Sequence, residues 1–195
     1  AAGVRRVEAL RDKQLEDYLK KKEKISDISL EKNNEIIKEL SSQIISFGAK
    51  PNLDQSDQKL LIKNLTKQLE TLSIRSILND KDKNIICDDE INNIKVRFQR
   101  VIDLPSKELR NLVDQGKKDL KEGVIIIISS KDEKVGIAVG VTNKYTEKYD
   151  AVKFVNVGSK ILGGNGGGGR RDFAQAGGSD ESKINETFAN LKYLI

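Results

Sequence analysis

The strongest constraint in this sequence is a glycine tract near its C-terminal end. Six of the seven residues from Gly163 to Gly169 are glycine. Each glycine loses more backbone entropy on folding than any other residue, so neither a helix nor the interior of a sheet favours such a run. The tract therefore predicts a loop that needs positive φ angles repeatedly, or one whose backbone something must approach closely.

Two arginines follow the tract directly. Consecutive backbone N–H groups in a glycine loop can form a concave anion-binding site. Arg170 and Arg171 can each grip a phosphate through a bidentate guanidinium fork. Together these features predict a backbone-lined loop that binds anions.

Three other interpretations of the tract are weaker. A flexible linker is disfavoured because structured sequence resumes at once. Gly164, Gly166 and Gly169 formally match the dinucleotide pattern G-x-G-x-x-G, but that pattern needs a strand before it and a helix after it. Here the expected order is reversed. A P-loop is also excluded, since no Gly-Lys-Ser/Thr ends the tract.

Composition limits the chemistry. The 195 residues carry 35 Lys and Arg against 30 Asp and Glu, a surplus of +5 that permits binding to a polyanion without establishing it. Histidine is absent and Cys87 is the only cysteine, which excludes an intrachain disulfide and a Cys-rich zinc site. No apolar run approaches the roughly 20 residues of a membrane span. We expect a soluble protein of a reducing compartment, the cytoplasm, without membrane contact.

No catalytic residue, metal site or cofactor is predicted in this segment. Asp88, Asp89 and Glu90 are adjacent carboxylates in a polar stretch, where we expect a solvated acidic turn. Asp172 is expected to fix the glycine loop through an ion pair with the neighbouring arginines rather than to bind metal. Without histidine or a second cysteine, no pair of nucleophile and base stands out.

The N-terminal half indicates helices. Residues 3–10 suggest a short strand entering a helix, and residues 11–24 carry many lysines on a weakly apolar helix. Two further helices, within residues 25–80, each show a narrow stripe of two apolar positions per heptad, which is typical of a coiled-coil seam. The stripe residues are Ile37, Leu40, Ile44 and Phe47 in the first helix and Ile62, Leu65, Leu69 and Leu72 in the second. Gly48 is expected to end the first helix and Asp54 to cap the second. The two seams could pair as a hairpin or meet another chain.

The C-terminal half has the alternating pattern of a compact domain. The polar residues 80–93 are expected to mark a boundary. Strands are predicted near 96–102, 124–128, 135–141 and 172–176, with helices near 106–120, 149–162 and 184–195. The predicted fold class is therefore α+β: a long helical segment (a coiled-coil hairpin) followed, from about 94 to 195, by a compact α/β domain with a mixed central sheet.

Two motifs resemble a known family. Gly166 to Gly178, GGGGRRDFAQAGG, is similar to the C-terminal glycine motif of alanyl-tRNA synthetases, usually GGGGRPDMAQAGG. Residues 2–9, AGVRRVEA, resemble the end of the editing domain of the same enzymes, and in that family a helical coiled coil separates the two motifs. The departures are Arg171 for the usual proline and Phe173 for the usual methionine.

The resemblance implies a division of the chain and a role. Residues 1–24 would be the tail of an editing domain with a basic helix, 25–80 a coiled-coil segment, and 94–195 a globular tRNA-binding domain. The full enzyme charges tRNA with alanine, using ATP, magnesium and zinc, and clears mischarged tRNA. Its C-terminal region is non-catalytic, binds the tRNA elbow and in some members dimerises. We expect a fragment of such an enzyme, with no activity of its own.

The predicted tRNA contacts come from the motif and from nearby charge. They are Gly166, Gly167, Gly168, Gly169, Arg170, Arg171, Lys160 and Gln175. A second set, Lys20, Lys21, Lys22 and Lys24, is expected mainly to form a solvated face, with a sequence-independent RNA contact as the alternative.

Two alternatives to tRNA binding stay open. In the first, residues 30–78 form a homodimer and the glycine loop only packs the domain. In the second, the chain is related to the DHH-type phosphoesterases, in which a glycine tract and a histidine contact substrate phosphate. The absence of histidine disfavours the second.

Overall fold

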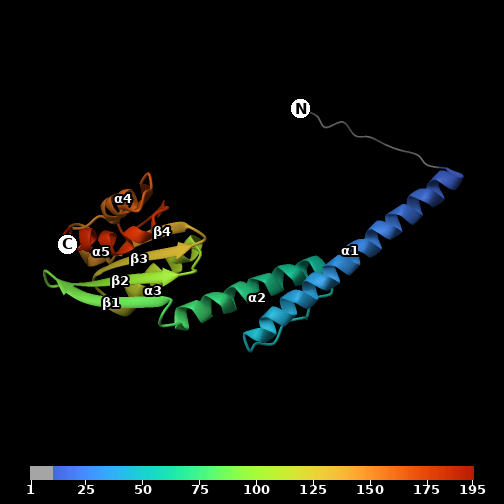
Figure 1. Ribbon diagram of the computed structural model, residues 1–195, viewed down its shortest axis with the longest axis horizontal. Helices are drawn as coiled ribbons and strands as arrows, with labels where there is room; N and C mark the ends of the chain where they lie inside the picture. The colour runs from blue at the N-terminus through green and yellow to red at the C-terminus, as the bar shows by residue number, and fades with distance from the viewer. Residues whose placement is uncertain (1–10) are drawn as a thin grey trace. The chain divides into compact units, whose positions relative to one another are not determined.

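The computed structural model describes residues 11–195, apart from the side chains of residues 25–27. The chain divides into two compact units, one ending at Ser73 and one from Ile74 to Ile195, and both are drawn in Figure 1. The strand predicted at residues 3–10 lies outside the described residues. None of the described helices is long and apolar enough to cross a membrane.

The first unit is a helical hairpin. Helix α1 (Asp12–Ser46) is joined to α2 (Gln58–Asn79), whose last residues belong to the second unit. Ile44 and Leu65 are fully buried between the helices. Leu61 is buried with them and Ile62 is only half-buried, so that part of the predicted stripe was one residue out of register. The two seams therefore meet within one chain.

Helix α1 is longer than the sequence pattern suggested. It runs without a break from the lysine-rich residues into the hairpin, so the basic helix predicted at 11–24 is the first part of α1. All four lysines of that set are exposed. The helix ends where expected, because Gly48 has a φ of +74°, a conformation that glycine adopts at little cost.

The connection between α1 and α2 corrects the predicted cap. Asp57, not Asp54, caps α2: its Oδ1 accepts hydrogen bonds from the N–H groups of Lys59 (2.8 Å) and Leu60 (3.2 Å). The N–H of Asp54 instead donates to the Asn52 side chain within the loop. Gln68 on α2 anchors the loop, since its Oε1 accepts the Asn52 N–H (3.1 Å) and its Nε2 donates to the Lys50 carbonyl (2.8 Å). The first helical turn begins about three residues later than predicted.

Alanine at Asp57 is expected to destabilise the hairpin by ~1 kcal/mol, because two N–H groups of the first turn lose their acceptor. Alanine at Asp54 is the matched control, with the same change of charge three residues away. It is expected to have little effect on stability. Thermal unfolding followed by far-UV circular dichroism compares the two variants, and equal losses would contradict the assignment of the cap.

The second unit is built on a mixed sheet of six strands in the order β1-β2-β3-β4-β6-β5. The strands are β1 (Asn84–Ile91), β2 (Ile94–Ile102), β3 (Val124–Lys131), β4 (Lys134–Val141), β5 (Gly167–Arg170) and β6 (Phe173–Gly178). Only β2 and β3 are parallel, and the mixed sheet is as predicted. Three neighbouring pairs are hairpins with two-residue turns, at 92–93, 132–133 and 171–172.

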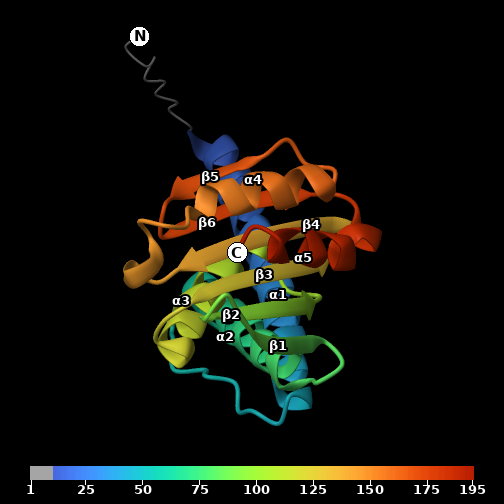
Figure 2. The same cartoon turned by 90° about the vertical axis from the view of Figure 1, so that its left-hand side faces the viewer.

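Helices cover both faces of the sheet (Figure 2). Helices α4 (Ala151–Ile161) and α5 (Ile184–Lys192) pack on one face. Helix α3 (Leu109–Leu120) packs on the other, together with the last turns of α2. Strand β3 runs between these layers and is buried from Val124 to Ser130, as its continuous β-branched run predicts.

The polar stretch at 80–93 is not an irregular connector. Most of it is β1, the edge strand paired with β2. The expected acidic turn is also wrong, since Asp88 accepts two hydrogen bonds from Arg97 (2.7 and 2.8 Å) and Asp89 pairs with Lys192. The Arg97 guanidinium lowers the pKa of the Asp88 carboxyl, chiefly by hydrogen bonding to it. An edge strand stabilised by cross-strand ion pairs does not need the apolar alternation on which the prediction relied.

Candidate nucleic-acid interface

The glycine tract is part loop and part strand. Residues 163–166 connect α4 to β5, while Gly167 to Arg170 form β5 itself, paired only with β6. The prediction of a loop throughout was therefore wrong. A side chain at Gly167 would place its Cβ 2.3 Å from the carbonyl oxygen of Gln175. Close pairing with β6 therefore requires glycine at this position. The pairing offsets the backbone entropy that glycine loses on folding, on which the prediction of a loop relied.

Four N–H groups of the tract are used inside the domain, and those of Gly163 and Gly164 donate to the carbonyls of Lys160 and Ser159. The Gly166 N–H donates to Ser159 Oγ (3.2 Å), and the Gly167 N–H donates to Asn156 Oδ1 (3.0 Å). Gly166 has a φ of +104°, which turns its N–H toward α4. Gly168 is different, because it is exposed and a Cβ there would meet no atom within 4 Å. The open part of the tract is therefore the strand, not the loop.

Both arginines are held in place while staying exposed. Arg170 Nε lies 3.0 Å from Asp172 Oδ1, and its side chain is 71% exposed. Arg171 donates from Nη2 to the Glu147 carbonyl (3.1 Å) and lies 3.9 Å from Asp150, with 61% of its side chain exposed. The predicted ion pair of Asp172 is thus confirmed for Arg170. Hydrogen bonding to Arg170, with the charge of Lys117, lowers the pKa of the Asp172 carboxyl.

Two residues of α3 join this cluster and were missed in the sequence. Lys117 Nζ donates to the Asp172 carbonyl (2.7 Å), which also accepts from the Val141 N–H (2.9 Å). The guanidinium of Arg110 lies 5.2 Å from the centre of the Phe173 ring. Positions 110 and 117 are seven residues apart and so lie on the same flank of α3. This spacing was the feature of the sequence from which their common location could have been predicted. We name Arg110, Lys117, Arg170 and Arg171 the arginine-hairpin cluster.

The remaining predicted contacts lie elsewhere. Gln175 is half-buried, and its side-chain amide donates to the carbonyl of Ser106, at the start of the short helix η1 (Ser106–Glu108). Lys160 is exposed in the last turn of α4. Arg171 lies at the other end of that helix, where its carbonyl accepts the Ala151 N–H. The structure therefore leaves Lys160 apart from Arg170 and Arg171, which adjoin one another in the sequence.

Comparison with known proteins identifies the family of this domain. The sequence profile described as the DHHA1 domain matches residues 93–195, more than half of the chain. The chain belongs to the DHHA1 domain family.

Similarity to alanine–tRNA ligases extends along the whole chain. The enzyme of Fusobacterium nucleatum is 36% identical and that of Parvibaculum lavamentivorans 30% identical, each over 100% of this chain. The chain spans 21% of the length of these curated relatives. A solved structure described as the C-Ala domain from Aquifex aeolicus alanyl-tRNA synthetase has a TM-score of 0.53 at 30% identity, covering 55% of this chain and 96% of that domain. The predicted resemblance to a C-terminal region of alanyl-tRNA synthetases is confirmed.

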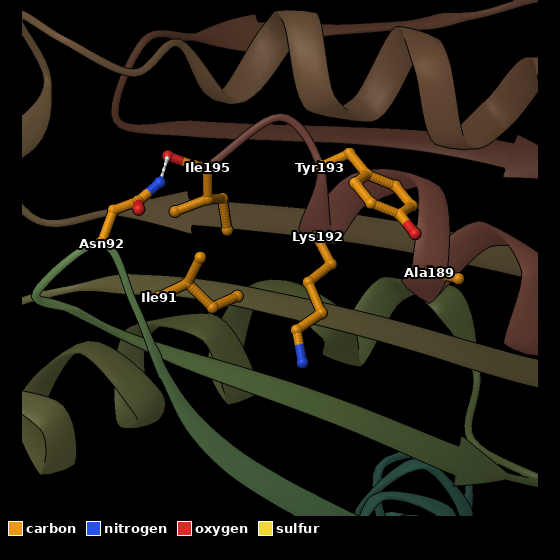
Figure 3. Close-up of a pocket in the computed structure, with 6 residues that line it drawn as sticks. All are labelled: Ile91, Asn92, Ala189, Lys192, Tyr193 and Ile195. Atoms are coloured by element: carbon orange, nitrogen blue, oxygen red, sulfur yellow. Dashed lines mark hydrogen bonds between the residues drawn. The ribbon is translucent and has the colours of Figure 1, made fainter.

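A hollow of the DHHA1 domain, drawn in Figure 3, differs from the arginine-hairpin cluster. It lies at the β1 edge, and its lining includes Ile91, Ala189 and Tyr193. Two of its polar side chains are already paired: Asn92 donates to the Ile195 carbonyl (3.1 Å), and Lys192 pairs with Asp89 outside the hollow. No surplus charge faces this hollow. It is therefore a weaker candidate for binding an anion than the arginine-hairpin cluster.

The arginine-hairpin cluster suits binding better than catalysis. Its four cations have no nucleophile beside them, and the nearby carboxylates of Asp150 and Asp172 are engaged in ion pairs. Within residues 11–195, no group of three or more His, Cys, Asp or Glu side chains could hold a metal ion. Two fixed guanidinium groups at the end of the three consecutive glycines of β5 can receive phosphates at close range.

Proposed function

We propose that this chain binds tRNA, as the non-catalytic C-terminal portion of a cytoplasmic alanine–tRNA ligase. The observation that carries the proposal is the pair of exposed, oriented guanidinium groups of Arg170 and Arg171 at the end of the glycine strand. The aminoacylation and editing reactions, with their ATP, magnesium and zinc, belong to the rest of the proposed enzyme.

The geometry suits a folded RNA. Recognition of the tRNA elbow requires close approach to a shaped backbone rather than the reading of a base sequence. Gly168 leaves open space on β5, and Arg170 follows two residues later. Few aromatic side chains are present to stack on unpaired bases, since aromatic residues make up 5% of the sequence. A phosphate-gripping edge fits the elbow better than it fits a single strand.

A titration of tRNA(Ala) tests the proposal. We expect a dissociation constant of roughly micromolar or tighter at low salt, weakening steeply as salt rises, because phosphate contacts release counterions. The control is a linear RNA of the same length without tertiary structure. The chain is expected to bind it more weakly. Equal affinity for both RNAs, or binding that does not respond to salt, would contradict recognition of a folded tRNA.

One observation favours a structural role for the tract as a second candidate. Gly166 and Gly167 use their N–H groups inside the domain, as a packing element would. In that case the helical hairpin could be the functional part, through a homodimer over residues 30–78. Sedimentation separates the candidates: a monomer at high concentration that still binds tRNA would rule out the dimer as the only role.

A further inference from the structure

A hollow rich in lysine lies beside the arginine-hairpin cluster. The end of α3, the connection to β3 and the short helix η2 (Asn143–Tyr145) enclose about 410 Å³. Four of its lining residues are lysines, Lys117, Lys118, Lys121 and Lys144, and one is an acid, Glu122. Its lining therefore carries three positive charges in excess.

Most of this excess is available to a ligand. Lys144 pairs with Glu122, so these two charges compensate each other. Lys117 is held by Asp172 and is only 19% exposed. The amines of Lys118 and Lys121, by contrast, take part in no hydrogen bond or ion pair with any residue between 11 and 195. Two free ammonium groups thus face solvent at the rim of one hollow.

Lys121 occupies a strained backbone conformation. Its φ of 62° and ψ of −49° are those of a γ-turn with positive φ, closed by a 2.7 Å hydrogen bond from the Glu122 N–H to the Leu120 carbonyl. Glycine would adopt this conformation with less strain. Strained backbone conformations are found more often at ligand-binding and active sites than elsewhere in a fold. The lysine at this position is therefore a second indication of a site.

The hollow continues the arginine-hairpin cluster. Lys117 belongs to both: it lines the hollow, and its Nζ donates to the carbonyl of Asp172. Asp172 lies in the chain between the two arginines and β6. Val141 pairs with Val124, near the hollow, and its N–H donates to the same carbonyl. All these groups lie at one end of the sheet. A polyanion bound by Arg170 and Arg171 would thus have the hollow within reach at the same end of the sheet.

We propose that the lysine hollow binds backbone phosphates of the same tRNA that Arg170 and Arg171 contact. The inference rests on the proposed function and extends it to a second, sequence-independent contact through Lys118 and Lys121. The exposed amide of Asn143 can add a hydrogen bond to a phosphate oxygen.

The test uses the full chain with Lys118→Ala and Lys121→Gly together. Titration with tRNA at several salt concentrations is expected to show a dissociation constant about tenfold higher, and a salt slope smaller by about one to two, because two phosphate contacts are lost. The melting temperature is expected to equal or exceed that of the parent chain, since glycine relieves the strain at position 121. Arginine at both positions is expected to retain most of the binding.

The matched control removes the same charge elsewhere. Lys131 and Lys134 flank the turn between β3 and β4, at the opposite end of the sheet, and both are exposed. Their double alanine variant is expected to bind tRNA within about twofold of the parent. If the lysine-hollow variant matches this control while Arg170→Ala with Arg171→Ala weakens binding, this inference alone fails. If the parent chain does not bind tRNA at low salt, the proposed function fails with it.

Discussion

Alanine at both Arg170 and Arg171 is expected to weaken tRNA binding about 30-fold, which corresponds to ~2 kcal/mol. Both guanidinium groups are oriented by carboxylate or carbonyl contacts but keep most of their surface for a ligand. The substitutions remove two cations and release Asp150 from its ion pair with Arg171, while Asp172 keeps Lys117 as a partner at 3.6 Å. The uncompensated Asp150 carboxylate would then repel the RNA backbone, so the loss should exceed that of two isolated surface charges.

Filter binding or fluorescence anisotropy at two salt concentrations measures this effect. The salt slope is expected to fall by about two, one for each lost phosphate contact. The double alanine variant of Lys131 and Lys134 again controls for net charge. Unchanged affinity in the Arg170 and Arg171 variant would remove the hairpin from the interface and favour the packing role of the tract.

Alanine at Ile126 is expected to lower the free energy of unfolding by about 3 to 4 kcal/mol. Ile126 is fully buried in the central strand β3, within the cluster covered by α4 and α5. Removing three carbons there leaves a cavity that strands paired on both sides cannot close. Urea unfolding of the second unit, followed by tyrosine fluorescence, measures the loss.

Ile85 provides the control for that substitution. It lies on the edge strand β1 with 49% of its surface exposed. Alanine there is expected to cost less than about 1 kcal/mol, because little apolar surface is removed from burial. Similar losses at both positions would contradict the layered core. The folded Ile126 variant should keep its tRNA affinity, which separates an effect on stability from an effect on the interface.

The buried parts of the fold were readable from the sequence, and its edges were not. The run from Val124 to Ile128 predicted a strand covered on both faces because no polar residue interrupts it. The two edge strands, β1 and β5, escaped prediction for opposite reasons. Strand β1 carries carboxylates that only their tertiary partners explain, Arg97 on β2 for Asp88 and Lys192 on α5 for Asp89. Strand β5 is mostly glycine, whose place in a sheet depends on how closely β6 approaches.

Some residues of the candidate site were also predictable from the sequence, and others were not. The glycine motif located Arg170 and Arg171 directly. Lys160 was included because it is near the motif in sequence, yet α4, 11 residues and about 16 Å long, separates it from Arg171. Arg110 and Lys117 were missed because their spacing places them on one flank of α3 but does not tell whether that flank faces the hairpin. That choice is made by tertiary packing, and only the structure shows it.

The three two-residue hairpin turns bear on how quickly the site is assembled. Hairpins with such short connections form in about 1 to 10 μs, because little chain entropy is lost in closing them. The turn that carries Arg171 and Asp172 is one of these. Pairing of β4 with β6 requires the chain from Thr142 to Asp172 to be organised first, and is expected to be slower. On a newly made chain, the arginines would therefore be presented on a formed hairpin before Lys117 reaches across from α3 to hold it.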